Sequence, residues 1–350
     1  MGDLIRIDGS EGEGGGQILR TSLALSMVTG RPFEIVNLRA GRSKPGLRPQ
    51  HLLCVKASGR ICSAGIEGAT LGSQTVRFAP GDVRHGTYRF DVGTAGSTSL
   101  VLHTLYLPLA LASGRSILTI TGGTHALFAP TYHFLERQWA VLLRRIGVEV
   151  ELDLVRAGFY PRGGGEIRAK IHPATAVRPL TLGPRGELER LEGVSAVSDL
   201  PKAIAERQRR RAMAQLRKAG LDAGIELASL PPAGKGTVLH LLATFEGGGR
   251  ACYDALGARG KRAEAVADEA AEGLVSFLAT SGAIDEHAAD QLILPLALAN
   301  GPSSFPVPAV TSHLLTNARV IERFLPCRIH VDGDVGSESD VRVSPTRGGI

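Results

Sequence analysis

Hydrophobic and polar positions follow two different periods along the chain. Segments in which every second residue is apolar are typical of strands, and they cover residues 4–7, 33–38, 117–120, 148–154 and 328–331. Longer segments repeat an apolar residue every three or four positions between flanking Gly, Pro, Ser or Thr, which is typical of helices. These segments cover residues 17–28, 49–59, 97–111, 130–146, 201–219, 261–278, 286–298 and 312–324. Because the two kinds of segment are interleaved, the sequence predicts an α/β fold.

The predicted helices fall into pairs, and the second helix of three pairs begins in a similar way. A histidine stands just inside that helix each time, as His51, His133 and His313. A pattern that recurs in this way predicts three units of common architecture, each with two helices packed on one face of a sheet.

The stretch from residue 184 to residue 280 interrupts this pattern. It has two predicted helices and strands of its own, so we expect an inserted domain between the second and third units. Its first helix carries a run of arginines from Arg207 to Arg217, which is more typical of a solvated face than of an RNA-binding surface. The predicted domains are 1–183 with units one and two, 184–280 as the insertion, and 281–350 with unit three.

The composition limits the number of domains, the kinds of partner and the compartment that we expect for the protein. The 350 residues allow roughly two domains, and the net charge of +6 permits a polyanionic partner without requiring one. The four cysteines show no Cys-x-x-Cys spacing and indicate reduced thiols. The N-terminal residues alternate like a strand rather than a signal peptide, and no apolar run reaches the roughly 18 residues of a membrane span. We therefore expect a cytoplasmic protein that does not enter a membrane.

Two clusters of glycine and charged residues, at 11–20 and 39–50, have the composition of anion-binding loops. Glycines ahead of an apolar helix leave backbone N–H groups free to face a phosphate, and arginines add donors. Neither cluster contains the P-loop or dinucleotide-binding pattern, and the chain has no G-x-S-x-G or H-E-x-x-H motif. The clusters therefore favour nucleotide or nucleic-acid chemistry outside those classes.

Six longer motifs include parts of these two clusters and continue along the rest of the chain. They are GEGGGQILR at 12–20, GRSKPGL at 41–47, DVGTAGS at 91–97, FYPRGGG at 159–165, ADQ at 289–291 and SHLLTN at 312–317. Through these motifs the chain resembles the RNA 3′-terminal phosphate cyclases over essentially its whole length. The resemblance implies a large domain of three repeated units, each with two helices on a four-stranded sheet, related to the enolpyruvyl transferases, and a smaller inserted α/β domain.

The resemblance also implies a ligase reaction on RNA that ends in a 3′-terminal phosphate. A histidine attacks the α-phosphorus of ATP and expels pyrophosphate, and the adenylyl group then passes to the RNA 3′-phosphate. The neighbouring 2′-hydroxyl closes a 2′,3′-cyclic phosphate and releases AMP, so one difficult displacement is divided into easier steps. ATP and a divalent metal, Mg²⁺ or Mn²⁺, are the implied cofactors, and no obligate protein partner is evident.

Site residues follow from their positions in the matching motifs. His313 would be the adenylylated nucleophile, and Glu13 would be the metal ligand. The remaining positions would bind ATP or phosphate; they are Arg20, Arg39, Arg42, Gln50, Asp290 and Gln291. On the residues alone, a capping or core role fits each of the three helix-start histidines equally well, a carboxylate near a helix start also explains Glu13, and an exposed helix position also explains Asp290.

Two positions depart from the family pattern. His103 stands where the family commonly has a glutamine that contacts ATP, and His287 stands where a tyrosine commonly precedes the Ala-Asp-Gln motif. A histidine can still hydrogen-bond to adenine or stack on it, so we expect ATP binding to persist with an altered base preference or affinity.

Two other functions compete with the cyclase interpretation. A noncatalytic cyclase-like protein of ribosome assembly would share the fold but lack the nucleophile, so the presence of His313, Arg42 and Asp290 argues against it. An enolpyruvyl transferase is suggested by repeat architecture alone, and fold analogy is a weak reason to assign a function.

Overall fold

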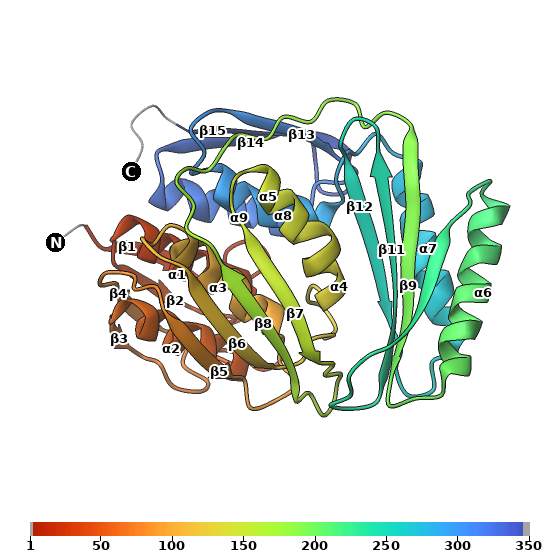
Figure 1. Cartoon of the computed structure of the whole chain (residues 1–350). Coiled ribbons are helices and arrows are strands. Elements are labelled where there is room, and N and C mark those ends of the chain that lie inside the picture. The colour runs from red at the N-terminus through yellow and green to blue at the C-terminus, as the bar shows by residue number, and fades with distance from the viewer. Residues whose placement is uncertain (1–2, 346–350) are drawn as a thin grey trace.

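The computed structural model describes residues 3–345, and the chain forms two bodies that lie side by side (Figure 1). The larger body contains three sheets with their helices, and the smaller body contains the fourth sheet. The α/β class predicted from the sequence is confirmed. None of the helices in this part of the chain is both long enough and apolar enough to cross a membrane.

The first unit establishes the pattern of the larger body. Its elements are β1 (Ile5–Asp8), α1 (Gly16–Thr29), β2 (Phe33–Val36), α2 (Pro49–Cys62), β3 (Gly65–Glu67) and β4 (Val76–Ala79). The sheet has the order β1-β2-β4-β3, in which β1 and β2 are parallel and the other pairs are antiparallel. Apolar side chains alternate along β1 and β2 and face the helices, as the period of two predicts.

The second unit repeats this order with longer strands. Its elements are β5 (Thr87–Asp91), α3 (Thr98–Ala110), β6 (Ser116–Gly122), α4 (Tyr132–Phe134), the π-helical turn η1 (Leu135–Trp139), α5 (Ala140–Arg145), β7 (Val150–Arg156) and β8 (Gly165–Ile171). The sheet order β5-β6-β8-β7 matches that of the first unit, strand for strand. The helix predicted at 130–146 is thus present but widened by a π-helical turn in its middle, a feature often found near functional sites.

The third unit is assembled from two separate parts of the chain. Its elements after the insertion are α8 (Glu286–Leu296), β13 (Ser303–Val307), α9 (Ser312–Phe324), β14 (Cys327–Val331) and β15 (Ser339–Pro345), with sheet order β13-β15-β14. Residues 177–182, which precede the insertion, run parallel to β13 through a bridge between Thr181 and Ser304 and a hydrogen bond from Leu182 N to Ser304 O of 2.8 Å. This segment takes the place that β1 and β5 occupy in the other units, so the third sheet has three assigned strands rather than the four expected. We therefore propose that the third unit begins near residue 177 instead of residue 281.

The smaller body contains β9 (Leu188–Ser198), α6 (Lys202–Lys218), β10 (Gly224–Ser229), β11 (Gly236–Phe245), β12 (Arg250–Leu256) and α7 (Ala263–Leu278). Its sheet has the order β10-β9-β11-β12, and both helices lie on one face over a core of their own that includes Leu216, Leu274 and Phe277. These elements lie within the range 184–280 that the sequence assigns to an inserted domain. Arg207 and Arg211 of α6 pair with Glu264 and Asp268 of α7, so part of the arginine run fastens the two helices together.

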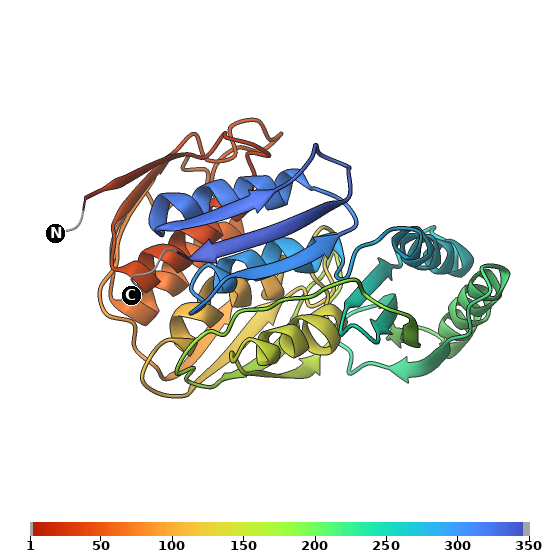
Figure 2. The same ribbon diagram turned by 90° about the horizontal axis from the view of Figure 1, so that it is seen from above.

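The three sheets of the larger body lie on the outside and the helices fill its centre (Figure 2). Helix α1 contacts both α3 and α9, and its side chains Leu19 and Leu23 are fully buried. Burying apolar side chains at about 25 cal/mol per Å² is the main force that holds such a centre together. The contact between α1 and α9 brings two segments together that are almost three hundred residues apart in the sequence.

Candidate functional site

The loop that precedes α1 is held against the first turns of α9. Gly12 has a φ of +58°, and a Cβ added there would lie 2.1 Å from Thr316 Oγ1, so only glycine fits. The backbone N–H of Glu13 donates to the same Thr316 oxygen over 3.4 Å. Thr316 and His313 are three residues apart and therefore share one face of α9. The loop is thus positioned to place Glu13 beside His313.

His313 makes two polar contacts with this N-terminal region. It is the second residue of α9, whose cap is formed by Thr311 Oγ1 accepting from Leu314 N over 3.0 Å. Its Nδ1 lies 2.7 Å from Gln17 Oε1, and its Nε2 lies 2.6 Å from Glu13 Oε2. About half of the His313 side chain, 47%, is exposed to solvent.

Electrostatics favour a neutral His313. Burial lowers the pKa of His313, and the positive charges of Arg20, His287 and Arg42 lower it further, whereas Glu13 opposes them. Because Gln17 offers an oxygen, the hydrogen bond assigns the single proton of a neutral ring to Nδ1 and leaves the lone pair on Nε2. A neutral imidazole with a free lone pair is the form that can act as a nucleophile.

Glu13 has the features of a cation ligand. Arg42 Nη2 contacts its Oε1 at 2.6 Å. The close contact of Oε2 with His313 Nε2 is not aligned as a hydrogen bond, so Oε2 is buried without a hydrogen-bond partner among residues 3–345. A carboxylate oxygen without a hydrogen-bond partner is the kind of ligand that Mg²⁺ or Mn²⁺ prefers, so Glu13 Oε2 could hold such a cation.

A cavity of about 500 Å³ opens next to His313. Its walls come from α1, α3, the segment before α4, α4, η1, β12, α7, α8 and α9, so residues of both the larger and the smaller body line it. The polar and charged residues of the wall are Gln17, Arg20, Thr21, His103, Thr131, Asp254, Glu269, His287, Asp290, Gln291, His313 and Asn317. A cavity of this size and mixed lining is typical of a site for a small ligand such as a nucleotide.

Arg20 and Asp290 supply opposite charges on the wall next to His313. Burial raises the pKa of Asp290 to about 7, although the charges of His287 and Arg20 act against this rise. Burial likewise lowers the pKa of Arg20, against the effect of Cys54, Asp290 and Glu13. A phosphate would offset the buried positive charge of Arg20. The same phosphate would favour the neutral form of Asp290, because like charges repel.

Asn317 fixes the relative positions of the three helices around these charges. Its Oδ1 accepts from Thr21 Oγ1 over 2.6 Å, and its Nδ2 donates to the backbone oxygen of Asp290 over 2.7 Å. One side chain of α9 thereby connects α1 with α8. The amide is buried, where hydrogen bonds of this kind contribute about 1 kcal/mol each.

The far part of the cavity is aromatic and contains three unsatisfied polar atoms, two on His103 and Gln291 and the third, Nε1, on Trp139. The rings of His103 and Trp139 lie 4.8 Å apart, and Tyr106 packs edge-on against the same Trp139 at 4.8 Å. Burial, assisted by Arg20, lowers the pKa of His103 to about 3, so its ring is neutral. His103 Nε2 and Gln291 Oε1 are buried without hydrogen-bond partners within the described chain. Buried polar atoms usually have partners, so these two atoms fit a ligand with a flat polar ring such as a purine.

Two of the predicted phosphate-binding residues point toward backbone instead. Arg39 Nη1 donates to the carbonyl oxygens of Lys44 and Gly46 over 2.8 and 2.9 Å, which closes its own loop. Gln50 Oε1 accepts from the backbone N–H of Ser97 over 3.0 Å and fixes the start of α3. The structure thus brings Arg20, His103, His287, Asp290, Gln291 and His313 to the cavity, places Glu13 and Arg42 beside His313, and gives Arg39 and Gln50 loop-holding contacts.

Several residues of the cavity were not predicted from the sequence. Trp139 comes from the π-helical turn, and Tyr253 and Asp254 come from β12 of the smaller body. No motif marks them, because an aromatic or acidic residue in an alternating strand is ordinary. Only the packing of the smaller body against the larger one reveals their role.

The other two helix-start histidines have different surroundings. His51 is buried, its Nδ1 accepts from the backbone N–H of Arg48 over 3.3 Å, and its Nε2 would lie 2.2 Å from a Cβ on Gly16. His133 is also buried, with its Nδ1 3.1 Å from Nε2 of His125. His51 thus has the capping role and His133 the packing role that the sequence left open for all three.

Comparison with known proteins identifies the family of the chain. The sequence model of the family described as RNA 3′-terminal phosphate cyclase matches residues 11–331. The chain belongs to the RNA 3′-terminal phosphate cyclase family. The resemblance inferred from six motifs is thereby confirmed, and with it the assignment to an enzyme family.

Curated relatives named RNA 3′-terminal phosphate cyclase are similar to the chain over nearly its whole length. The protein of Nostoc punctiforme is 44% identical over 336 residues, which cover 94% of this chain and 96% of the relative. The protein of Caldivirga maquilingensis is 46% identical and covers 93% and 94%, and that of Methanopyrus kandleri is 43% identical and covers 98% and 99%. Among solved structures, the enolpyruvyl transferase NikO from Streptomyces tendae aligns with 97% of this chain and 48% of its own, at 11% identity and a TM-score of 0.40. A likeness at that level carries no further argument.

Proposed function

We propose that this protein converts the 3′-terminal phosphate of RNA to a 2′,3′-cyclic phosphate in an ATP-dependent reaction that passes through a covalent His313–AMP adduct. The observation that carries the proposal is the arrangement of His313: a half-exposed, neutral imidazole at a nucleotide-sized cavity, with its lone pair on Nε2. Family membership supports the overall reaction, and this geometry supports the nucleophile.

In the first step, His313 Nε2 forms a bond to the α-phosphorus of ATP while the bond to pyrophosphate breaks. The proton stays on Nδ1, which donates it in a hydrogen bond to Gln17 Oε1, and this bond stabilises the positive charge that develops on the ring. Arg20 would bind a phosphate oxygen, and the fork of guanidinium donors suits that role. A divalent metal held by Glu13 would neutralise charge on the phosphates when it is bound.

In the second and third steps, a terminal phosphate oxygen of the RNA takes the adenylyl group from His313. The ribose 2′-oxygen then loses its proton and bonds to the phosphorus of this RNA 3′-phosphate. The bond between that phosphorus and AMP breaks, and AMP is released. Asp290, with a pKa of about 7, can accept or return a proton near neutral pH and would adjust the charge at the cavity wall. His103 and Gln291 would hold the adenine through their unsatisfied atoms.

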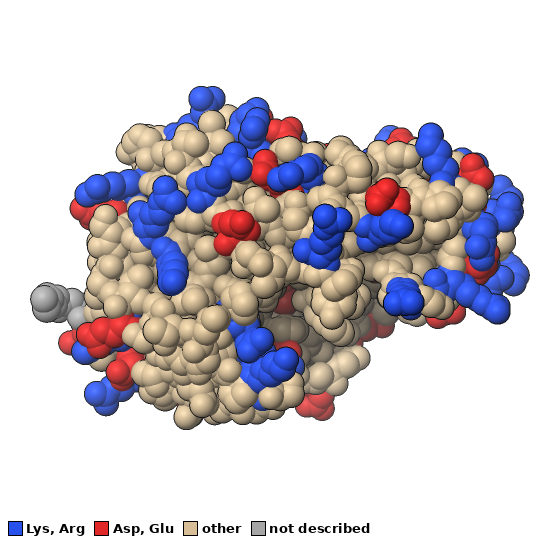
Figure 3. Space-filling view, turned by 90° about the horizontal axis from the view of Figure 1, so that it is seen from below, with Lys and Arg blue, Asp and Glu red and all other residues tan. Residues whose placement is uncertain are grey.

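The surface charge is compatible with a polyanionic substrate. In the space-filling view a hollow separates the two bodies, and lysine and arginine side chains gather on the end formed by the smaller body (Figure 3). These side chains lie at the end of the smaller body and not at the hollow, so their charge permits a polyanionic partner without placing it at the site. The four cysteines are all unpaired and buried, which supports a reducing, cytoplasmic location.

The experiment that tests this function incubates the protein with ATP labelled at the α-phosphate and a divalent metal. We expect an acid-labile, base-stable labelled protein, and cyclised ends when RNA 3′-phosphate is added. The matched control is His330→Ala, because His330 is an exposed histidine on β14 with a side chain that is 62% accessible. If the wild-type protein forms no adduct and leaves RNA ends uncyclised, the result matches a noncatalytic ribosome-assembly role instead. If His313→Ala is still labelled, His313 is not the nucleophile.

A further inference from the structure

A second cluster of possible metal ligands lies on the wall of the cavity that the smaller body contributes. His240 of β11 stands directly opposite Asp254 of β12, and Cys252 is two residues before Asp254 on the same face of that strand. One donor atom from each of the three side chains lies within 4.8 Å of the others. We propose that His240, Cys252 and Asp254 bind a divalent transition metal such as Zn²⁺, at a site separate from Glu13.

The donor set determines the class of metal. An imidazole, a thiolate and a carboxylate together are typical ligands of zinc and of neighbouring transition metals, whereas Mg²⁺ takes oxygen ligands almost alone. With metal–ligand bonds of about 2.0–2.3 Å, the donor atoms around a tetrahedral zinc lie about 3.3–3.8 Å apart. His240 Nδ1 and Asp254 Oδ1 are now 2.5 Å apart, and the wider span to Cys252 is below 4.8 Å. Shifts of about 1 Å therefore bring the three atoms to metal-binding distances.

The cluster is buried and pre-arranged. His240 is fully buried and Cys252 is 2% exposed. The ring nitrogen of His240 that faces Asp254 is Nδ1. The other ring nitrogen, Nε2, is buried and has no hydrogen-bond partner in the part of the chain that the structure covers. Side chains held in place by a strand pair lose little conformational freedom when they bind a metal.

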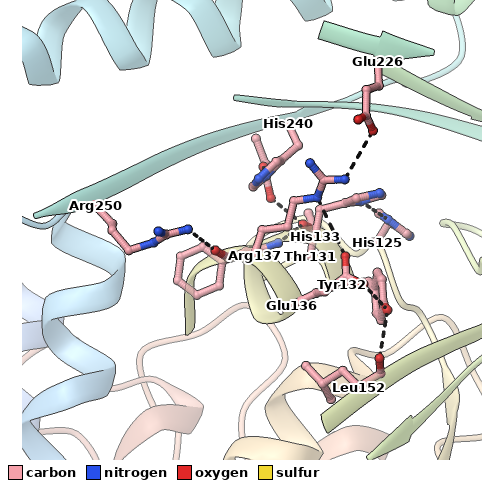
Figure 4. A network of polar contacts seen from close by, with 12 residues as sticks. His125, Thr131, Tyr132, His133, Glu136, Arg137, Leu152, Glu226, His240 and Arg250 are labelled. Atoms are coloured by element: carbon pink, nitrogen blue, oxygen red, sulfur yellow. Dashed lines mark hydrogen bonds and ion pairs between the residues drawn. The ribbon is translucent and has the colours of Figure 1, made fainter. Parts of the chain in front are cut away.

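The larger body supplies the outer contacts of the cluster. Figure 4 shows His240 pointing from β11 toward Thr131 and His133 at the start of α4. Thr131 Oγ1 donates to Asp254 Oδ2, which orients the carboxylate. Hydrogen bonds of this kind to ligating carboxylates typically change metal affinity by about 10–100-fold.

The two bodies are also fastened together around this position. Arg250 donates to the backbone oxygen of Arg137 over 2.7 Å, and Arg137 pairs with Glu226 at 3.5 Å (Figure 4). The cluster therefore lies where the smaller body contacts the larger body.

Cys252 and Asp254 also line the cavity. Three protein ligands with one side open to a cavity leave a fourth position for water or for a bound ligand, as in zinc sites that accept exogenous ligands. The competing explanation is a plain ion pair between His240 and Asp254, in which Cys252 has no part.

The test uses the full-length protein, stripped of metal with a chelator and then titrated with Co²⁺ and Zn²⁺. Wild type should bind one Co²⁺ per chain at this site, measured by a near-ultraviolet thiolate-to-cobalt charge-transfer band, and Zn²⁺ should displace it. Cys252→Ser should abolish the band, and His240→Ala and Asp254→Asn should each weaken Co²⁺ binding at least about tenfold. The Cys252→Ser change is nearly isosteric, and circular dichroism checks that this variant is folded.

Two matched controls separate this site from other parts of the chain. Cys327→Ser removes another buried free thiol on β14, and Glu13→Gln removes the carboxylate beside His313. Both should keep the cobalt band. The proposal is overturned if wild type binds no stoichiometric Co²⁺ or if the band survives Cys252→Ser. Neither result depends on adenylylation, so it leaves the proposed cyclase function to its own test.

Discussion

The first turns of α2 and α9 have similar sequences, but the histidine in each turn has a different role. His51 in α2 accepts from a backbone N–H of its own helix start, and burial together with Arg20, Arg39 and Arg48 lowers its pKa to about 3. His313 in α9 keeps about half of its side chain accessible and contacts side chains from another part of the chain.

The difference lies in what faces each helix start. Gly16 at the start of α1 packs directly against the ring of His51, which leaves no space for a ligand there. In contrast, the start of α9 faces the Glu13 loop and an open cavity. A repeated motif therefore provides the same residue in each unit, and the neighbouring unit decides whether that residue is structural or reactive.

Replacing the two histidines in turn should give the largest effect. We expect His313→Asn to reduce labelling from α-labelled ATP by at least about 10³-fold, because no other group can take the place of a covalent nucleophile. His51→Asn should keep the yield of label per folded molecule while it lowers the midpoint of thermal unfolding. Equal loss of label in both variants, with both folded, would contradict the distinction between them.

The second prediction concerns the loop that distinguishes α9 from α2. Gly12→Ala adds a Cβ that collides with Thr316 at a positive φ, so Glu13 should move away from His313. A displacement of about 1 Å can slow such a reaction by roughly 10²-fold, which single-turnover labelling would measure. The control is Gly41→Ala, because a Cβ there meets no atom within 4 Å. Similar rates in the two variants would show that the loop does not position Glu13.

The third prediction uses the raised pKa of Asp290. The folded state binds this proton more tightly than the unfolded state, so the stability from the neutral acid is complete below about pH 4 and is lost as the pH rises through about 7. Between pH 5 and pH 8, wild type should lose about 2–3 kcal/mol of unfolding free energy relative to Asp290→Asn. Urea unfolding at both values measures the difference, with the exposed Asp222→Asn as the control. A constant difference between wild type and Asp290→Asn would mean that the carboxyl is not the titrating group.

The smallest expected effect is that of Gln50→Leu. Its amide holds the backbone of Ser97, so the change should cost about 1 kcal/mol of stability. The KM for ATP in the labelling reaction should stay within about threefold of wild type if the side chain only holds the loop. A larger rise in KM, with normal stability, would restore Gln50 to the phosphate-binding role that its motif implies.

Much of the fold could be predicted because its signals are local. The helix predicted at 312–324 has the observed bounds, since Thr311 caps its start and apolar residues recur along one face. The helix predicted at 286–298 ends two residues early, at Leu296, after the Pro295 ring removes a donor. The π-helical turn within 130–146 leaves the apolar period almost unchanged and could not be foreseen from it.

The arrangement of the third unit could not be predicted in the same way. Its first strand position is filled by residues 177–182, whose partner β13 lies more than a hundred residues further along the chain. Parallel pairing has no turn signal between its strands, because the connection can hold a whole inserted unit. For the same reason the contributions of Trp139, Tyr253 and Asp254 to the cavity emerge only when the two bodies pack together.

The sequence by itself determined the class of fold, the approximate positions of the helices, the repeated pattern and the family, because periodicity, caps and long motifs are read along the chain. Only the tertiary structure decided which helix-start histidine is accessible, why Arg39 and Gln50 turn to backbone, and which atoms remain without partners around the cavity. The physical reason is that burial, pKa and unsatisfied hydrogen bonds depend on neighbours that are distant in the sequence and adjacent in space.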